Sequence, residues 1–182
     1  MNIGIDISQV VYEGTGVGRY VREMVKHLVR IDSNNTYVLF GSSLRQQDAL
    51  RLFCNEIKII NPSVKTVIIP FPPTMLDVLW NIFHIFPITW FTGPLDLFWS
   101  SDWTQPPLGK ASGMTTIHDV SFLKFPNSFP QKIIQVQKRR LHQVKKACQI
   151  ILCDSKTTKD DVEKYLNIPE EKLIVVYPGY HA

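Results

Sequence analysis

The chain has 182 residues and a formal net charge of +4, with 45% hydrophobic and 20% charged residues. This length and composition are typical of one soluble globular domain with a real core, and the mild charge gives no argument for a nucleic-acid partner. Three cysteines without metal-type spacing (Cys54, Cys148 and Cys153) predict reduced, buried or half-buried thiols in a cytosolic protein.

Strand and helix patterns alternate through the first half of the chain. The first strand pattern follows Met1 directly, so we expect no signal peptide. Apolar residues at helical spacing predict a helix over residues 17–31, and a second helix is predicted over 43–53. The predicted strands of this half span residues 2–7, 36–40, 57–60 and 64–69.

The second half continues the same alternation. A long helix is predicted to end near residue 147, and Ser155 is placed to cap a helix that runs to residue 166. Strands separated by helices predict an α/β fold with a doubly wound, mostly parallel sheet. The predicted strands of this half span residues 95–100, 114–117, 149–153 and 173–177.

Residues 71–103 hold all four tryptophans, and they have two interpretations. Charged residues and prolines interrupt the apolar run too often for it to span a bilayer. The segment is either a helix with loops that cover one face of the sheet, or an exposed aromatic surface. Such a surface would meet a lipid-linked acceptor or a membrane.

The predicted helix over residues 131–146 is basic and carries no acidic residue. Its apolar stripe is Ile134, Leu141, Val144 and Cys148, so the charges lie on its other faces. The default interpretation is a solvated face, and the alternative is contact with lipid headgroups or a phosphorylated acceptor. Nucleic acid is disfavoured because no aromatic residues interleave with the charges. The basic residues are Lys132, Lys138, Arg139, Arg140, Lys145 and Lys146.

A glycine-rich loop lies between the first strand and the first helix. Gly14, Gly16 and Gly18 let the backbone approach a ligand closely, the helix start offers N–H groups to an anion, and Arg19 adds a positive charge. The spacing differs from the dinucleotide fingerprint, which needs G-x-G-x-x-G directly after the strand. This difference argues against a nucleotide-binding oxidoreductase.

His118 and Asp119 follow the β-branched run that predicts the strand at 114–117. Ligands of open α/β sheets bind at the carboxyl ends of the strands. Adjacent residues in a strand point to opposite faces, so the two side chains can share a site only if the strand ends there. The other interpretation is a histidine capped by its neighbour at the end of a strand.

Several motifs together resemble glycosyltransferase family four, the retaining enzymes with the GT-B fold. Gly16-Val17-Gly18-Arg19-Tyr20 is similar to the family's Gly-Ile-Gly-Arg-Tyr element, and Thr116-Ile117-His118-Asp119 to its Thr-Ile-His-Asp-Leu segment. Asp154-Ser155 resembles its Val-Ser-x-x-Ser element, and Pro178-Gly179 resembles the end of its first domain. The matches run in order over nearly the whole chain.

The resemblance implies two Rossmann-like domains that face a cleft, with residues 1–182 as the N-terminal, acceptor-side domain. It implies that Gly16, Val17, Gly18, Arg19 and Tyr20 approach the diphosphate of the nucleotide sugar or an acceptor phosphate. His118 would lie beside the transferred sugar, and Asp119 would hold His118 or its loop. Transfer of a hexosyl or other glycosyl group would retain the anomeric configuration and need no metal or other cofactor. Further expected acceptor contacts are Asp102, Trp103 and Ser155.

Two departures from the family pattern qualify this expectation. Trp99 stands where relatives often carry a histidine. The sequence given stops just past Pro178-Gly179, so the donor-binding C-terminal domain, with its Arg/Lys pair and glutamates, is missing from it. We therefore expect the chain alone to be inactive and to need that domain in cis or in trans.

The expected partners are a nucleotide sugar, a sugar or lipid-linked acceptor and the C-terminal domain, with no nucleic acid. The expected location is cytoplasmic, with possible peripheral contact at the inner face of the membrane. The alternative function is a non-catalytic module, derived from such an enzyme, that binds an acceptor or a membrane. The sequence leaves the sugar, the nucleotide, the acceptor and the oligomeric state open.

Overall fold

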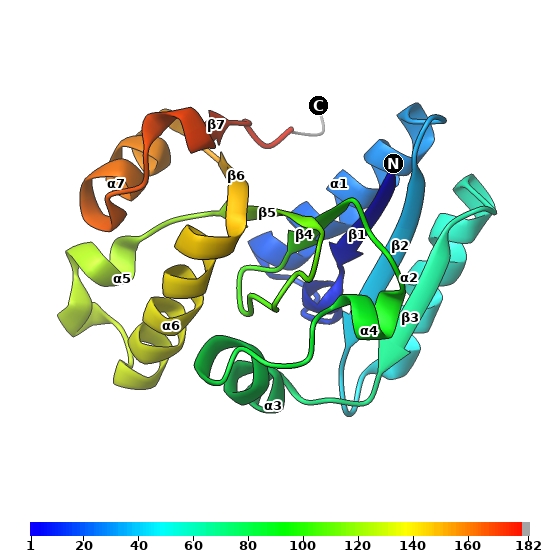
Figure 1. Cartoon of the computed structure of the whole chain (residues 1–182), viewed down its shortest axis with the longest axis horizontal. Coiled ribbons are helices and arrows are strands. Elements are labelled where there is room, and N and C mark those ends of the chain that lie inside the picture. The colour runs from blue at the N-terminus through cyan, green and yellow to red at the C-terminus, as the bar shows by residue number, and fades with distance from the viewer. Residues whose placement is uncertain (180–182) are drawn as a thin grey trace.

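A computed structural model describes residues 1–179, which form one seven-stranded sheet with the strand order β3-β2-β1-β4-β5-β6-β7 (Figure 1). Every neighbouring pair of strands is parallel. The order reverses between β1 and β4, which is where ligands bind in open sheets of this kind. The strands are β1 (Asn2–Asp6), β2 (Thr36–Ser42), β3 (Lys65–Ile69), β4 (Leu97–Ser100), β5 (Ser112–Ile117), β6 (Cys148–Cys153) and β7 (Leu173–Val175).

Helices cover both faces of the sheet, as predicted. On one face lie α1 (Gly16–Ile31) and α2 (Gln47–Ile60), which pack on β1 and β2. The other face carries two groups of helices. Beside β1, β2 and β4 are α3 (Pro73–Leu76), the π-helical turn η2 (Asp77–Ile82) and α4 (Thr89–Thr92); beside β5, β6 and β7 are α5 (Ser121–Lys124), α6 (Gln131–Ala147) and α7 (Lys156–Leu166). Single 3₁₀ turns are η1 (Ser8–Val11), η3 (Pro126–Ser128) and η4 (Glu170–Lys172).

One predicted strand is wrong: residues 57–60 form the last turn of α2. The buried side chains of this helix are Leu50, Phe53, Cys54 and Ile57, whose spacing matches a helical period. A short apolar run has no periodicity that separates a strand from a buried helical turn. The same helix begins at Gln47 rather than at residue 43.

The aromatic segment partly covers the sheet, as one of its two interpretations predicted. The Trp80 side chain is fully buried and packs against Phe40 and Phe91, with ring centroids 5.7 and 6.4 Å away. Other large side chains of the segment point to solvent, among them Phe83 and Trp90. No helix within residues 1–179 is both long and apolar enough to cross a bilayer.

Candidate functional site

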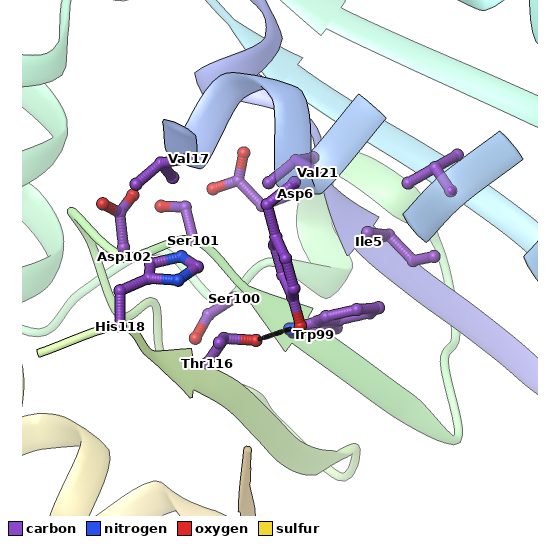
Figure 2. A pocket seen from close by; sticks show the side chains of 12 residues that line it. Ile5, Asp6, Val17, Val21, Trp99, Ser100, Ser101, Asp102, Thr116 and His118 are labelled. Atoms are coloured by element: carbon purple, nitrogen blue, oxygen red, sulfur yellow. Dashed lines mark hydrogen bonds between the residues drawn. The ribbon is translucent and has the colours of Figure 1, made fainter. Parts of the chain in front are cut away.

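Polar side chains gather at the carboxyl ends of β1, β4 and β5, beneath the first turn of α1 (Figure 2). Asp6 ends β1, Ser101 and Asp102 follow β4, and His118 follows β5. Their side chains line one small hollow with a cavity volume of about 20 Å³, which lies at the position where the strand order reverses. The apolar wall of this hollow includes Ile5, Val17, Tyr20, Val21, Val25 and Trp99.

A second, larger hollow of about 1560 Å³, including its open side, lies against the start of α1. It brings together four of the residues that the glycine-rich motif singled out, and it adds His118 from β5. Asp154, at the end of β6, also lines it. The four motif residues are Gly16, Val17, Arg19 and Tyr20.

The first turn of α1 is capped by a side chain. The Thr15 hydroxyl accepts a hydrogen bond from the Gly18 amide at 3.1 Å, and its own hydrogen donates to the Tyr12 carbonyl at 2.8 Å. The first amides of an α-helix have no intrahelical partner, so those of Gly16 and Val17 are the ones that can meet an anion. The Gly18 amide is already used by the cap.

Gly18 is also a close-packing position. A Cβ atom there would lie 2.7 Å from the Tyr12 carbonyl oxygen and 2.9 Å from that of Gln9, whereas a Cβ on Gly16 would meet nothing within 4 Å. We expect Gly18→Ala to lower the free energy of unfolding by about 1–3 kcal/mol, because backbone atoms must move to admit the methyl group. Gly16→Ala is the matched control, and urea denaturation should find it close to the wild type. Equal losses in the two variants would contradict this packing argument.

The partner of the His118 side chain is Asp154. Asp154 Oδ2 lies 2.6 Å from His118 Nδ1, and both side chains are mostly buried. The backbone is held as well, since the Thr158 hydroxyl donates to the His118 carbonyl at 3.2 Å. A carboxylate that accepts the Nδ1 proton fixes the tautomer in which Nε2 is an acceptor.

Asp119 holds the loop and not the imidazole. Its carboxylate accepts the Ser121 amide at 2.7 Å, at the start of α5. Ser155 caps α7 by accepting the Thr158 amide at 3.0 Å, and the Trp103 carbonyl accepts a hydrogen bond from Asn81. Neither hollow is lined by Asp119, Trp103 or Ser155, whereas Asp102 lines the small one.

Trp99 lines the small hollow and takes part in a hydrogen-bonded group of side chains. Its indole N–H donates to Thr116 Oγ1 at 3.2 Å (Figure 2), and the Tyr20 hydroxyl lies 3.4 Å from the same oxygen. The Tyr20 ring stands edge-on to both Trp99 and His118, with centroids 6.4 and 5.0 Å away. The tryptophan thus supplies one N–H to the protein itself and packs against Tyr20, whose ring lies next to His118.

The sequence interpretation missed two buried charged residues at this site. Asp6 is 3% exposed and Arg140 is 2% exposed. Arg140 Nε donates to the Ser101 carbonyl at 3.1 Å, and its Nη2 donates to Thr115 Oγ1 and the Thr116 carbonyl at 2.7 and 3.2 Å. Asp6 had a signal that was available, because it ends a strand as His118 does. No sequence signal marked Arg140 as buried, because it is one of six basic residues on the same helix.

The cysteines do not contribute a reactive thiolate. All three are free and buried. Burial raises the pKa of the Cys54 and Cys153 thiols to about 11 and that of Cys148 to about 12. Within residues 1–179, no cluster of three or more His, Cys, Asp or Glu side chains could hold a metal ion.

Comparison with known proteins agrees with this architecture. The family model described as Glycosyltransferase Family 4 matches residues 14–182, which is most of the chain. The chain belongs to glycosyltransferase family 4. No curated protein matches the sequence. Within the family 4 domain, the hollow beside α1 lies at the edge of the sheet where the sequence motifs converge.

Proposed function

We propose that this family 4 domain is the acceptor-side half of a retaining glycosyltransferase. One observation carries the proposal: the amide end of α1, Arg19 and the His118–Asp154 pair line a single hollow beside the carboxyl ends of β5 and β6. Helix amides and Arg19 suit a diphosphate or phosphate. An oriented imidazole suits an acceptor hydroxyl or the transferred sugar.

The proposed chemistry breaks the bond between the anomeric carbon and the diphosphate and forms a bond from that carbon to the acceptor oxygen, on the same face of the sugar. His118 Nε2 accepts the proton of the acceptor hydroxyl as the new bond forms and passes it to the departing phosphate. Fixed positive charges stabilise the leaving group, in place of a metal. Asp154 keeps the imidazole in the tautomer that this step needs.

The proposal assigns binding of the nucleotide sugar largely to a C-terminal GT-B domain, supplied in cis or in trans. We expect calorimetry with a panel of nucleotide sugars to show tight binding only when that domain is present, and transfer only then. Tight binding of NAD(P)H by residues 1–182 alone would contradict the proposal and favour an oxidoreductase.

We propose as a second candidate function that the domain binds a membrane surface that carries a lipid-linked acceptor. The supporting feature is a set of exposed apolar side chains on η2, on the segment that follows it and on α4, with exposed fractions of up to 71%, which we call the patch. The patch consists of Val78, Ile82, Phe83, Ile85, Phe86 and Trp90.

The backbone of the patch has an unusual conformation that the buried Trp80 stabilises. His84 and Phe86 have positive φ angles of 51° and 60°, which cost about 1–3 kcal/mol each for residues with a Cβ. The buried Trp80 holds them there: its indole N–H donates to the Phe86 carbonyl at 3.1 Å, and its carbonyl lies 2.9 Å from His84 Nδ1. The Phe86 and Trp90 rings lie edge to face at 5.6 Å.

The charges around the patch suit an anionic surface. Asp77 is the acidic residue of segment 71–92, and it is paired with Arg139 of α6. Lys132 and Lys146 lie seven residues either side of Arg139, so the three share the side of α6 that faces η2. Aromatic residues flanked by cations are typical of proteins that lie in the lipid headgroup region.

Vesicle flotation tests the patch. We expect the chain to float with vesicles that contain anionic lipid, and Phe83→Ser/Trp90→Ser to reduce the bound fraction about 10-fold or more, because two large apolar side chains no longer insert. The matched control is Leu52→Ser/Ile59→Ser, which removes two side chains that are 65% and 84% exposed on α2, across the sheet. If the chain never floats, or if both variants lose binding equally, the patch does not bind membranes and the charges of α6 form an ordinary solvated face.

A further inference from the structure

A third hollow lies between the loop that leads into α1, the first two turns of α1, and α2. Its cavity volume of about 580 Å³ falls within the range of about 300–1,000 Å³ that is typical of small-molecule sites. Gly16 and Arg19 line both this hollow and the larger one that contains His118, so the two hollows meet at the start of α1. We call it the outer hollow, and its lining includes Tyr12, Glu13, Arg22, Leu52, Phe53 and Glu56.

Glycines leave the boundary between the two hollows open. A Cβ atom on Gly14 or Gly16 would meet nothing within 4 Å, whereas Gly18 is needed for close packing. The outer hollow lies against a different face of α1 from the larger hollow, so a ligand with parts in both must extend round the start of the helix. Such a ligand is longer than one sugar ring.

Arg22 is a positioned hydrogen-bond donor in the outer hollow. Its guanidinium lies over the Phe53 ring, 4.8 Å from the centroid, and its Nη1 donates to Glu56 Oε2 at 3.3 Å. Among residues 1–179, Glu56 is the only hydrogen-bond partner of this side chain, so the other N–H groups of the guanidinium remain for a ligand. The side chain is 25% exposed, and a ligand can therefore reach these groups.

The charges that line the outer hollow balance. Arg19 and Arg22 contribute two positive charges, and Glu13 and Glu56 contribute two negative ones. A phosphate there would meet two like charges, and so would an ammonium group. A neutral ligand with hydroxyl groups can accept hydrogen bonds from the guanidinium groups and donate others to the carboxylates at the same time.

The rim of the outer hollow adds apolar surface, because Tyr12 is 42% exposed and Leu52 is 65% exposed. A sugar ring presents C–H groups on its faces and hydroxyls at its edge, so it suits an exposed aromatic ring beside an oriented guanidinium. We propose that the outer hollow is a second acceptor subsite, which binds the neutral sugar unit next to the one at His118. This inference rests on the proposed function, and it names the acceptor as an oligosaccharide of at least two units.

Nuclear magnetic resonance on residues 1–182 tests the inference without a C-terminal domain. The probes are methyl glycosides of glucose, galactose, mannose and N-acetylglucosamine, disaccharides with each of these sugars at the non-reducing end, and inorganic phosphate. We expect at least one disaccharide to shift the amide signals of Tyr12, Arg22 and Phe53 together with that of His118. It should bind about 10-fold or more tightly than its monosaccharide, because only the disaccharide reaches both subsites.

Tyr12→Ser is the decisive variant. It removes an exposed ring and keeps the main-chain carbonyl that accepts the Thr15 hydroxyl, so its melting temperature and amide dispersion should stay close to those of the wild type. Its affinity for the disaccharide should fall about 10-fold, to that of the monosaccharide, whose own binding should not change. The matched control is Tyr165→Ser on α7, which removes a ring that is 38% exposed and lines none of the three hollows.

Four results would overturn the inference: no shift with any sugar, equal affinity for a disaccharide and its monosaccharide, disaccharide shifts confined to the larger hollow, or shifts at Tyr12, Arg22 and Phe53 caused by phosphate instead. The proposed glycosyltransferase function fails on a different measurement, which is the absence of transfer by the domain together with its C-terminal partner. Transfer to monosaccharides that is as efficient as transfer to disaccharides would sink the second subsite and leave that function standing.

Discussion

Replacing Arg140 with methionine should lower the free energy of unfolding by about 3–5 kcal/mol, the range for removing one partner from a buried charged network. The guanidinium ties the segment after β4 to the end of β5 through the Ser101 and Thr116 carbonyls and Thr115 Oγ1. Methionine fills a similar volume but donates nothing, so these oxygens lose their partner. The negative charge of Asp102 also loses its nearby countercharge.

Urea denaturation monitored by tryptophan fluorescence measures this loss. The control is Lys138→Met, which makes the same type of substitution at an exposed position two residues away on α6. Surface substitutions of this kind usually stay within about 0.5 kcal/mol of the wild type. If Arg140→Met were as stable as Lys138→Met, the guanidinium would not be a structural centre of the site.

The order of the elements was predictable because periodicity and capping are local. The strand before His118 and the cap at Ser155 each follow from a few neighbouring residues, and the structure has them at the predicted places. The glycine-rich segment was predicted as a loop, whereas Gly16 and Gly18 already belong to the first turn of α1. A parallel sheet then brings the carboxyl ends of its strands to one edge. This rule predicts that His118 lies at the same edge of the sheet as the loop that leads into α1.

The partners within the site were not predictable in the same way. His118 and Asp154 are 36 residues apart, and they meet because β5 and β6 are neighbours in parallel register, with Ile117 opposite Cys153. Asp119 is adjacent in sequence, but its carboxylate is used by the amide two residues ahead, as aspartates at turns commonly are. Proximity in sequence therefore offered Asp119 as one possible partner of His118, whereas the pairing of β5 and β6 supplies Asp154.

The aromatic segment contains both buried and exposed side chains, so sheet cover describes only part of it. Segment 71–92 is a set of short turns in which one side chain of a pair can enter the core while its neighbour faces solvent. Trp80 is fully buried against Phe40, and Phe83, one turn later, is 64% exposed. Irregular backbone has no fixed period, so composition alone does not assign each residue to an environment.

Replacing His118 with alanine should lower kcat/KM for sugar transfer about 100-fold or more, if the domain functions as proposed, because an oriented imidazole is lost from the reacting centre. The assay pairs residues 1–182 with a C-terminal family 4 domain and a nucleotide sugar. Asp119→Asn is the matched control, since asparagine still accepts the Ser121 amide and the residue lies outside both hollows. Equal losses in the two variants would assign the effect to the loop.

Asp154→Asn separates the positioning role of the carboxylate from the presence of the imidazole. In the wild type, Asp154 accepts the Nδ1 proton of His118, so ¹⁵N spectra of the neutral ring should show an unprotonated Nε2. An asparagine amide can donate to Nδ1 instead, which favours the opposite tautomer and turns a proton-bearing Nε2 toward the hollow. We therefore expect a changed ¹⁵N pattern and a fall in kcat with little change in the KM for the nucleotide sugar. An unchanged tautomer combined with an unchanged kcat would show that the imidazole acts without this carboxylate, and would leave the 2.6 Å contact a structural one.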